Sequence, residues 1–497
     1  MLSIVLYSGS AMVVGKASLL LGSSRAPANG LSMQVAGTMP VSVDTTATKQ
    51  VDVVIVGAGA AGVGTALMLT KTFGLDPSSV LLVERGEEVG ATFRRWPAEM
   101  RFISPSFNMQ GWTNSFDLNS VAFGTSPAYS LHEQHPSGAQ YADYLSALVS
   151  SAKLNVRTST EVTSITPPEE EGGLFSVSVR SRDTAGVDKL APKYVVWAAG
   201  EFQYPSETQF TGAIEGAEHC LHNSRVKSWA ELEGDDFVVI GGYESGSDAT
   251  FNLAKAGKKC TMLASSASWD VSNPDPSTEL APYTAARLRE VTAEGFAPRP
   301  NLLAPLRVHK VEKAEEGGFN VFAEWKEPKA AGSPGPLRTP LEANAMAPAG
   351  KKLVVRTPQP PILATGFQGS VSAAASHLFN LADEKDEAES GCLCRAPLIT
   401  DHDESTKVPG VFLVGPTVSH GCLSFCFIYK FRQRFAIVAD AICRGLGRDT
   451  TQSVQDCRMM DMYLDDIKYR EALMKHMSNL NTKEDCVDDA CGKACSC

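Results

Sequence analysis

Two glycine-rich motifs, at residues 57–62 and 241–246, have the composition and spacing of phosphate-binding turns. Each follows a largely apolar run, 51–56 before the first motif and 237–240 before the second. A strand, a glycine turn and a helix in this order bring free backbone N–H groups and the positive end of a helix dipole to a pyrophosphate. Two such motifs predict two dinucleotides. The usual pair is a flavin and a nicotinamide, between which a hydride passes.

The first motif is supported by an acidic residue downstream. A second apolar run, at 80–83, ends in Glu84, which lies 25 residues beyond Gly59. That distance is typical of a carboxylate that binds a ribose 2′-hydroxyl, although a solvated charge at the end of a strand would look the same. We therefore expect Gly57, Gly59, Gly62 and Glu84 to hold the flavin nucleotide.

The second motif is less regular, because Tyr243 stands where the middle glycine is usual. The strand expected at 260–264 ends in two serines, 265–266, so it offers no acid to bind a 2′-hydroxyl. Two lysines, 258–259, are close in the sequence and would favour a 2′-phosphate. These features favour NADPH over NADH at this motif.

Three further segments join apolar strands to glycines. Residues 194–200 and 361–367 are strands that run into two small residues and a glycine, as where a chain crosses between dinucleotide-binding domains. Residues 410–416 contain another strand that meets a glycine.

The order of these motifs over residues 50–450 resembles that of the two-dinucleotide-binding flavoproteins. That group includes low-molecular-weight thioredoxin reductases, bacillithiol-disulfide reductases and flavin-containing monooxygenases. The chain is similar in particular to bacterial NAD(P)-binding flavoproteins with a cysteine-rich C-terminal tail, at residues 95–97, 135–138, 242–246 and 425–435. The resemblance implies an α/β fold with two Rossmann-like domains, the NAD(P)-binding domain inserted into the FAD-binding domain. It also implies that residues 90–97 lie along the flavin.

The expected domains and cofactor-binding residues follow from the motifs and this resemblance. The domains are a leader at 1–47, the first part of the FAD-binding domain at 48–205, the NAD(P)-binding domain at 206–357, the second part of the FAD-binding domain at 358–450, and a helical extension with a cysteine-rich tail at 451–497. The residues expected to bind FAD and NADPH (or NADH) are Gly57, Gly59, Gly62, Glu84, Arg85, Thr92, Trp96, Gly200, Gly241, Gly242, Ser245, Gly246, Gly366 and Gly415.

Charge and hydropathy exclude two classes of partner. The net charge of −11 argues against nucleic acid, which requires a basic face. No apolar run reaches the roughly 18 residues that a membrane span requires. Residues 1–43 contain no Asp or Glu and eight serines, which is typical of a transit peptide to a plastid or mitochondrion. A signal peptide or a disordered start is the alternative, and without a leader we expect a cytoplasmic protein.

The cysteines are the second candidate for chemistry. The chain has twelve, but no CxxC or CxxxxC follows either glycine motif, so the usual redox disulfide of these reductases is missing. Cys422 and Cys426 follow Gly415, in a region that approaches the isoalloxazine ring in the resembled fold. A redox thiol there competes with the ordinary reading of a buried, apolar cysteine.

Four more cysteines lie in residues 486–497, among residues too polar to build a core. A redox arm could carry electrons from the flavin to an outside acceptor by thiol–disulfide exchange through Cys491, Cys495 and Cys497. A soft-metal site is a second interpretation, although the spacing is not a standard zinc spacing. The third interpretation is a tail with incidental thiols.

Together these features predict an enzyme, an FAD-dependent oxidoreductase that takes hydride from NAD(P)H and passes electrons to a thiol, disulfide or metal-type acceptor. The first alternative is a monooxygenase acting on a soft N or S centre. Against it, residues 210–212 are followed by His219 and His222 rather than by one histidine at the usual distance. The second alternative is a metal-binding or redox-sensing flavoprotein. The expected partner is a small-molecule or thiol substrate, and nothing in the sequence indicates an oligomeric state.

Overall fold

The structure is a computed structural model, and the ranges it describes begin at residue 49. They are 49–107, 117–170, 172–184, 186–206, 214–269, 271–272, 280–326, 333–334, 348–382, 396–421, 423–470 and 472. The predicted leader at 1–47 and the cysteines of the tail lie outside these residues. No helix in the described ranges is both long and apolar enough to cross a membrane.

The larger unit is built on a seven-stranded sheet in the order β3-β2-β1-β6-β5-β4, with β21 also pairing with β6. The strands are β1 (Lys49–Val56), β2 (Val80–Val83), β3 (Asn155–Arg157), β4 (Thr160–Thr166), β5 (Ser176–Ser181), β6 (Asp188–Trp197) and β21 (Val411–Leu413). β1, β2, β3, β6 and β21 are parallel, as in a dinucleotide-binding domain. β4 and β5 extend β6 as an antiparallel meander, which the alternating residues in 154–193 predict.

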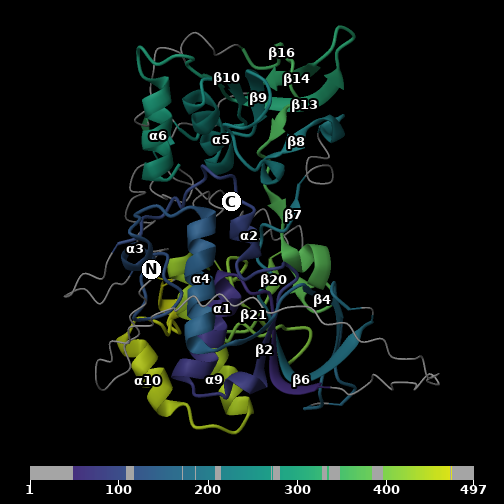
Figure 1. Ribbon diagram of the computed structural model, residues 1–497, viewed down its shortest axis with the longest axis vertical. Helices are drawn as coiled ribbons and strands as arrows, with labels where there is room; N and C mark the ends of the chain where they lie inside the picture. Colours follow the sequence, from purple (N-terminus) through teal and green to yellow (C-terminus); the bar gives the residue numbers. More distant parts are fainter. Residues whose placement is uncertain are drawn as a thin grey trace, which may run out of the picture.

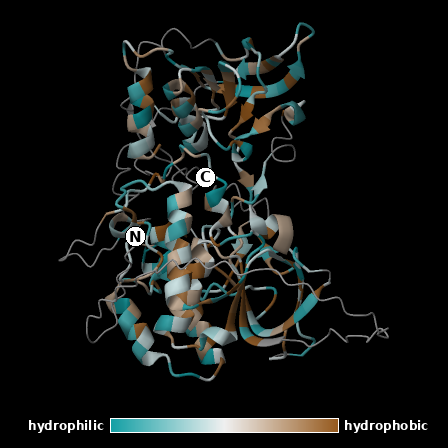
Figure 2. Cartoon of the chain, in the orientation of Figure 1, coloured by the Kyte–Doolittle hydropathy of each residue, from teal (hydrophilic) through white to brown (hydrophobic). Residues whose placement is uncertain are grey.

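Helices surround this sheet, and their apolar residues share one core with its strands (Figures 1 and 2). They are α1 (Ala60–Leu67), α2 (Ala91–Arg94), α3 (Pro127–Leu131), α4 (Gly138–Ala152), α8 (Ile428–Phe431), α9 (Phe435–Gly445) and α10 (Thr451–Met459). All eight residues of α1 are buried. Gly64 lets α1 approach α9 closely, since a Cβ there would lie 2.1 Å from the Phe435 ring. Ser137 and Gln140 form a capping box that begins α4.

The smaller unit has a parallel five-stranded sheet in the order β12-β10-β9-β17-β8. Its strands are β8 (Leu221–His222), β9 (Asp236–Ile240), β10 (Lys259–Leu263), β12 (Asn301–Leu303) and β17 (Ile362–Leu363). α5 (Glu244–Lys255) and α6 (Pro282–Thr292) pack together beside it. An antiparallel sheet of β13 (Leu306–Lys313), β14 (Phe319–Trp325) and β16 (Lys352–Thr357) accompanies them. Short strands β11 (Val271–Ser272) and β15 (Ser333–Pro334) pair with each other.

The chain crosses twice between the units, at β7 (Tyr204–Pro205) and β18 (Phe367–Gln368), which pair antiparallel. β7 lies between the upper and lower units in Figure 1. The remaining short pairs are β19 (Asn380–Leu381) with β20 (Pro397–Leu398) and β22 (Ser419–His420) with β23 (Leu423–Ser424). The α/β fold with two parallel-sheet units, one inserted into the other, is as the sequence predicts.

Two expected boundaries differ from the structure. β17 pairs with β8 and β9, so the smaller unit continues past residue 357 and the chain returns at β18. The helical extension expected from residue 451 is interrupted, because α10 ends at Met459, Met460–Asp461 form a turn, and residues 467–470 are helical again. β17 was misassigned because it is short and its partner strands are distant in the sequence.

Candidate functional site

The first glycine turn (residues 57–62) lies at the carboxyl end of β1, where parallel sheets bind nucleotides. Gly57 has a φ of +107°, and a Cβ there would lie 2.6 Å from the Ala198 carbonyl oxygen. Gly62 is equally constrained, because its Cβ would lie 2.0 Å from the Gly57 oxygen. These two glycines are therefore required by the turn itself.

Gly59 is different, because the protein does not require a glycine there. It precedes α1 with a φ of −84° and a ψ of −166°, which any residue adopts. A Cβ at this position would meet no described atom within 4 Å. The open space in front of the α1 N-terminus is the cradle that a pyrophosphate would fill.

Glu84 follows β2 beside the first glycine turn. Its Oε2 accepts a hydrogen bond from the Ala58 N–H at 2.9 Å, and its Oε1 accepts one from the Gly86 N–H at 2.7 Å. These bonds fix the carboxylate next to the turn and leave further lone pairs for a ribose hydroxyl.

Arg85 and Thr92 meet at a residue that the sequence did not single out, Gln203. Arg85 and Arg95 both donate to Gln203 Oε1, at 3.0 and 2.8 Å, and Gln203 donates to Thr92 Oγ1. Burial, followed by the charge of Arg85, lowers the pKa of Arg95. The two guanidinium groups thus lie together with a neutral partner between them.

Trp96 has another environment. Its ring lies in an aromatic cluster, 5.2 Å from the Phe93 centroid and 5.0 Å from that of Phe102. The cluster packs on the core of the larger unit. Within the described residues, Trp96 therefore packs against the core of the larger unit.

The second glycine turn (residues 241–246) repeats the geometry of the first. Gly241 has a φ of +110°, with its Cβ position 2.3 Å from the Ala364 carbonyl oxygen. A Cβ at Gly246 would lie 2.0 Å from the Gly241 oxygen. The N–H groups of Gly57 and Gly241 donate to Val83 and Leu263, respectively. Gly200 and Gly366, which follow the strands opposite each turn, both have positive φ.

Four positions of the second turn differ chemically from the first. Tyr243 has a φ of −90° and a ψ of −158°, so it takes the place of Gly59 with the same backbone. Gly242 fits closely, because a Cβ there would lie 2.3 Å from that of Ala264. Ser245 follows Glu244 in the first turn of α5.

Glu244, in place of Ala60, begins α5 and is buried. Its carboxylate accepts hydrogen bonds of 2.5 Å from the Ala281 N–H and from Thr284 Oγ1, at the start of α6. Burial raises the pKa of Glu244 to about 7, against these hydrogen bonds and helped by the charge of Asp248. The Glu244 carboxylate therefore links the N-terminus of α5 to the N-terminus of α6, on the side where a nucleotide would bind.

The residue equivalent to Glu84 is Ala264, since each follows the strand residue that accepts from the turn. The serines at 265–266 are exposed beside it. The expectation that Lys258 and Lys259 stand nearby is wrong. Both lie at the amino end of β10, and Lys258 donates to the carbonyl oxygens of Leu232 and Gly234. The two lysines are close to the site in the sequence, but the length of β10 separates them from it in the structure.

Among the contacts that join the larger unit to the smaller one are a hydrogen-bonded carboxylate and a stacked pair of rings. The Glu99 carboxylate accepts hydrogen bonds from Ser228 Oγ and from the N–H groups of Trp229 and Ala230, at 2.6, 3.0 and 3.2 Å. The His135 ring stacks on Tyr283 of α6, with centroids 3.7 Å apart and planes 10° apart. Both contacts link a loop of the larger unit to the smaller unit.

Gly415 follows β21 and faces α1, with its Cβ position 3.3 Å from that of Ala61. Two residues on, Thr417 donates to Glu201, which follows Gly200. Burial raises the pKa of Glu201, and hydrogen bonds from Thr417 and Ser370 oppose that shift. A buried carboxyl group with a raised pKa thus follows β6 and contacts the segment after β21. The sequence offered no signal for Glu201 beyond its place after a glycine.

A buried ion-pair network holds the segment after Gly415. Asp403 Oδ1 lies 2.6 Å from His420 Nε2, and Arg434 donates to both Asp403 oxygens. Arg434 and Asp403 are fully buried. Arg434 falls in a segment that the sequence singled out, but its partner Asp403 was missed because it lies in a loop with no motif.

The predicted catalytic cysteines are only partly described. Cys426 is half-buried, whereas Cys422, Cys491, Cys495 and Cys497 lie outside the described residues. Burial raises the pKa of the free thiols of Cys220, Cys260 and Cys457 to about 12 and that of Cys443 to about 11. Those four thiols stay protonated at neutral pH and are therefore poor nucleophiles. Within the described ranges no group of His, Cys, Asp and Glu could hold a metal ion.

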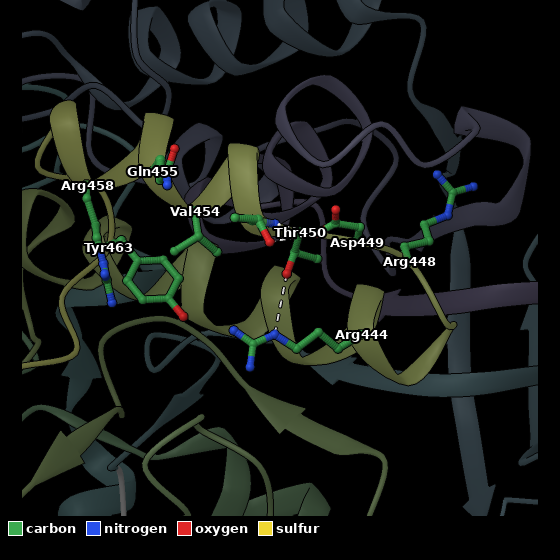
Figure 3. Close-up of a pocket in the computed structure, with 9 residues that line it drawn as sticks. Arg444, Arg448, Asp449, Thr450, Val454, Gln455, Arg458 and Tyr463 are labelled. Carbon is green, nitrogen blue, oxygen red and sulfur yellow. Dashed lines mark hydrogen bonds between the residues drawn. The ribbon is translucent and has the colours of Figure 1, made fainter.

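A cavity of about 440 Å³ lies elsewhere, between α9 and α10 (Figure 3). Three arginines line it, and Figure 3 shows the Arg444 side chain reaching toward Thr450. Arg444 pairs with the buried Asp440, and Arg458 pairs with Asp465. These pairings neutralise most of the charge, and the cavity is not formed by the glycine turns.

Comparison with protein families identifies the larger class. The family model described as pyridine nucleotide-disulphide oxidoreductase matches residues 54–327, which is more than half of the chain. The uncharacterized oxidoreductase CzcO of Bacillus velezensis is 24% identical over 222 residues, 43% of this chain and 54% of that protein. Indole-3-pyruvate monooxygenase YUCCA1 of Oryza sativa subsp. japonica is 26% identical over 214 residues, 42% of this chain and 47% of that protein. The chain thus spans about half the length of these curated relatives.

Solved structures agree on the fold. The bacillithiol disulfide reductase Bdr (YpdA) from Bacillus cereus matches with a TM-score of 0.55 and 20% identity, over 80% of this chain and 99% of that one. The reduced form of the ornithine hydroxylase PvdA from Pseudomonas aeruginosa matches with a TM-score of 0.57 and 16% identity, over 80% of this chain and all of that one. One is a reductase and the other a hydroxylase, so the shared fold leaves the acceptor open.

Proposed function

The chain belongs to the pyridine nucleotide-disulphide oxidoreductase family of flavin-dependent enzymes, and we propose that it uses FAD at the first glycine turn and NAD(P)H at the second. In this scheme hydride passes from the nicotinamide to the flavin. The electrons then go to a thiol, disulfide or metal-type acceptor. The observation that carries the proposal is the repeated turn geometry at Gly57 and Gly241, together with the open space at Gly59.

The described residues suit these roles. The backbone around Gly59 would accept a pyrophosphate, and Glu84, fixed by Ala58 and Gly86, would bind a ribose hydroxyl. FAD would supply the site that accepts hydride and later releases electrons. Glu201 would hold a proton near that site, since burial raises the pKa of its carboxyl group.

NADPH suits the second turn better than NADH. Ala264 replaces the acid that would bind a 2′-hydroxyl and repel a 2′-phosphate. The exposed serines at 265–266 would donate to a phosphate. This support rests on the residues at the carboxyl end of β10, without the lysines at its amino end.

The acceptor is proposed from Cys426 and from the cysteines outside the described residues. The four described thiols with raised pKa values are unsuited to exchange. A shuttle would therefore use Cys422 and Cys426 or the tail cysteines Cys491, Cys495 and Cys497. A soft-metal role for the tail is the competing proposal.

A monooxygenase that acts on a soft N or S centre is the second candidate. The described residues favour it in one respect, because no disulfide and no reactive cysteine pair is found among them. Such an enzyme would need no thiol beside the flavin.

One acceptor screen tests these alternatives. The protein is reduced anaerobically with NADPH and then mixed with the disulfide DTNB, with a soft metal ion, or with O₂. A chain truncated after Asn481 serves as the matched control, because it keeps both glycine turns. A shuttle through the tail predicts rapid disulfide reduction that requires the tail. Rapid reduction at equal rates in both chains would contradict that shuttle and leave the thiols of Cys422 and Cys426. Rapid reoxidation by O₂ with substrate hydroxylation, and none by the disulfide, would establish the monooxygenase instead.

A further inference from the structure

We infer that Glu244 makes nucleotide binding at the second glycine turn a proton-coupled event, in which the nucleotide binds with the Glu244 carboxyl protonated. The inference rests on the proposed NAD(P)H role of that turn and concerns how the site accepts a pyrophosphate. Glu244 would thus control the affinity for the nucleotide, whereas the glycines determine the shape of the turn.

The placement of Glu244 is the first step. It is the first residue of α5, so its carboxyl group lies within one turn of the N–H groups that would bind the pyrophosphate. At the same position the first turn has Ala60, which carries no charge. An ionised acid here would repel the pyrophosphate in a partly dry environment that screens little.

The second step is that the carboxyl group cannot simply turn away into water. It is held at both oxygens by α6, with 2.5 Å hydrogen bonds from the Ala281 N–H to Oε1 and from Thr284 Oγ1 to Oε2. Protonation therefore removes the charge of Glu244 at a lower free-energy cost than moving the side chain into water.

The third step concerns the charges around it. On α5 the buried Asp248 faces it, and on α6 Arg287 pairs with Asp248 at 2.7 Å. Arg287 is thus largely neutralised by another acid. From the larger unit, the titratable group near this cluster is His135, which stacks on Tyr283. Burial, and then the charge of Arg287, lower the pKa of His135.

The direction of the coupling follows. Without nucleotide, Glu244 has a pKa of about 7, so it is largely protonated at pH 6 and largely ionised at pH 8. A bound pyrophosphate raises that pKa further. Affinity is then constant below pH 7 and falls above it, by up to about tenfold per pH unit, while proton uptake on binding rises toward one.

Calorimetry of the oxidised holoenzyme with NADP⁺ and NAD⁺ tests this, because neither nucleotide reduces the flavin. Titrations from pH 6 to 8.5 in buffers of different ionisation enthalpy give the number of protons taken up. NAD⁺ is included because a 2′-phosphate itself titrates near pH ~6. We expect uptake near zero at pH 6 and approaching one at pH 8, with both nucleotides.

Three variants assign the proton. Glu244→Gln should bind with no uptake and with a dissociation constant independent of pH. Glu290→Gln is the matched control, since Glu290 lies exposed on α6 in a pair with Lys255, and it should keep the full uptake. His135→Gln should also keep it.

The wild-type protein alone can overturn the inference, so no variant has to fold for the test to count. Binding without proton uptake at pH 8 overturns it, as does undiminished uptake by Glu244→Gln or loss of uptake in His135→Gln. Each of these leaves the nucleotide assignment intact. No binding of either nucleotide at any pH overturns the assignment as well.

Discussion

The two glycine turns share a backbone and differ in what surrounds it. The first has Gly59, Ala60 and Glu84, and the second has Tyr243, Glu244 and Ala264 at the equivalent positions. The first turn thus presents an open, uncharged cradle beside a fixed carboxylate. The second has a tyrosine and the buried Glu244 at these positions and lacks a carboxylate equivalent to Glu84. Such a difference suits a tightly held nucleotide at the first turn and an exchangeable one at the second.

The largest expected effect comes from filling the open cradle. Gly59→Leu should weaken FAD binding at least a hundredfold, about 2.8 kcal/mol, because its side chain occupies the space for the pyrophosphate. The chain should still fold, since the Cβ meets no described atom within 4 Å. Flavin content per chain and thermal unfolding, compared with wild type stripped of flavin, measure the two effects. Full flavin retention would contradict the first assignment.

The next effect separates the second turn from the first. Gly241→Val should keep the yellow colour but slow reduction by NADPH at least tenfold, because a Cβ there would lie 2.3 Å from the Ala364 oxygen. Gly257→Val is a suitable control. Gly257 also has positive φ, +77°, but lies beyond the far end of α5. It should reduce within about twofold of wild type, and equal slowing in both variants would point to general destabilisation of the smaller unit.

A smaller effect comes from giving the second turn the acid of the first. Ala264→Glu should shift the ratio of kcat/KM for NADPH and NADH toward NADH by about tenfold, or about 1.4 kcal/mol. The new carboxylate would bind a 2′-hydroxyl and repel a 2′-phosphate. Lys259→Ala, at the other end of β10, should leave the ratio unchanged. A large change in Lys259→Ala would restore the role that the structure denies it.

The smallest effect concerns the contact between the units. Burial would raise the pKa of Glu99, but hydrogen bonds from Ser228, Trp229 and Ala230 outweigh it and lower the pKa overall. The contribution of Glu99 to the free energy of unfolding is therefore present above its unfolded-state pKa, ~4.3. That contribution is lost as the pH falls through the lower folded-state pKa. The midpoint temperature of thermal unfolding should fall more steeply below pH ~4.3 for the wild type than for Glu99→Gln. Parallel curves would show that this contact does not stabilise the protein.

The sequence was a sufficient guide wherever a local pattern decides the structure. The glycine turns, the strands before them and the position of Glu84 follow from spacing, because strand, turn and helix are adjacent in the chain. Glu201 was missed because its partner, Thr417, is 216 residues away. Asp403 was missed because its role exists only once His420 and Arg434 meet it. The positions of Lys258 and Lys259 were predicted wrongly, because these residues lie at the start of β10 whereas the site lies at its carboxyl end.

The most direct test of the central claim is anaerobic mixing of the yellow wild-type protein with one equivalent of NADPH, or of NADPH deuterated at the transferred position. If the two turns hold a flavin and a nicotinamide for hydride transfer, the flavin absorbance bleaches fully, and more slowly with the deuterated nucleotide. A flavin that stays oxidised under both conditions would contradict the account.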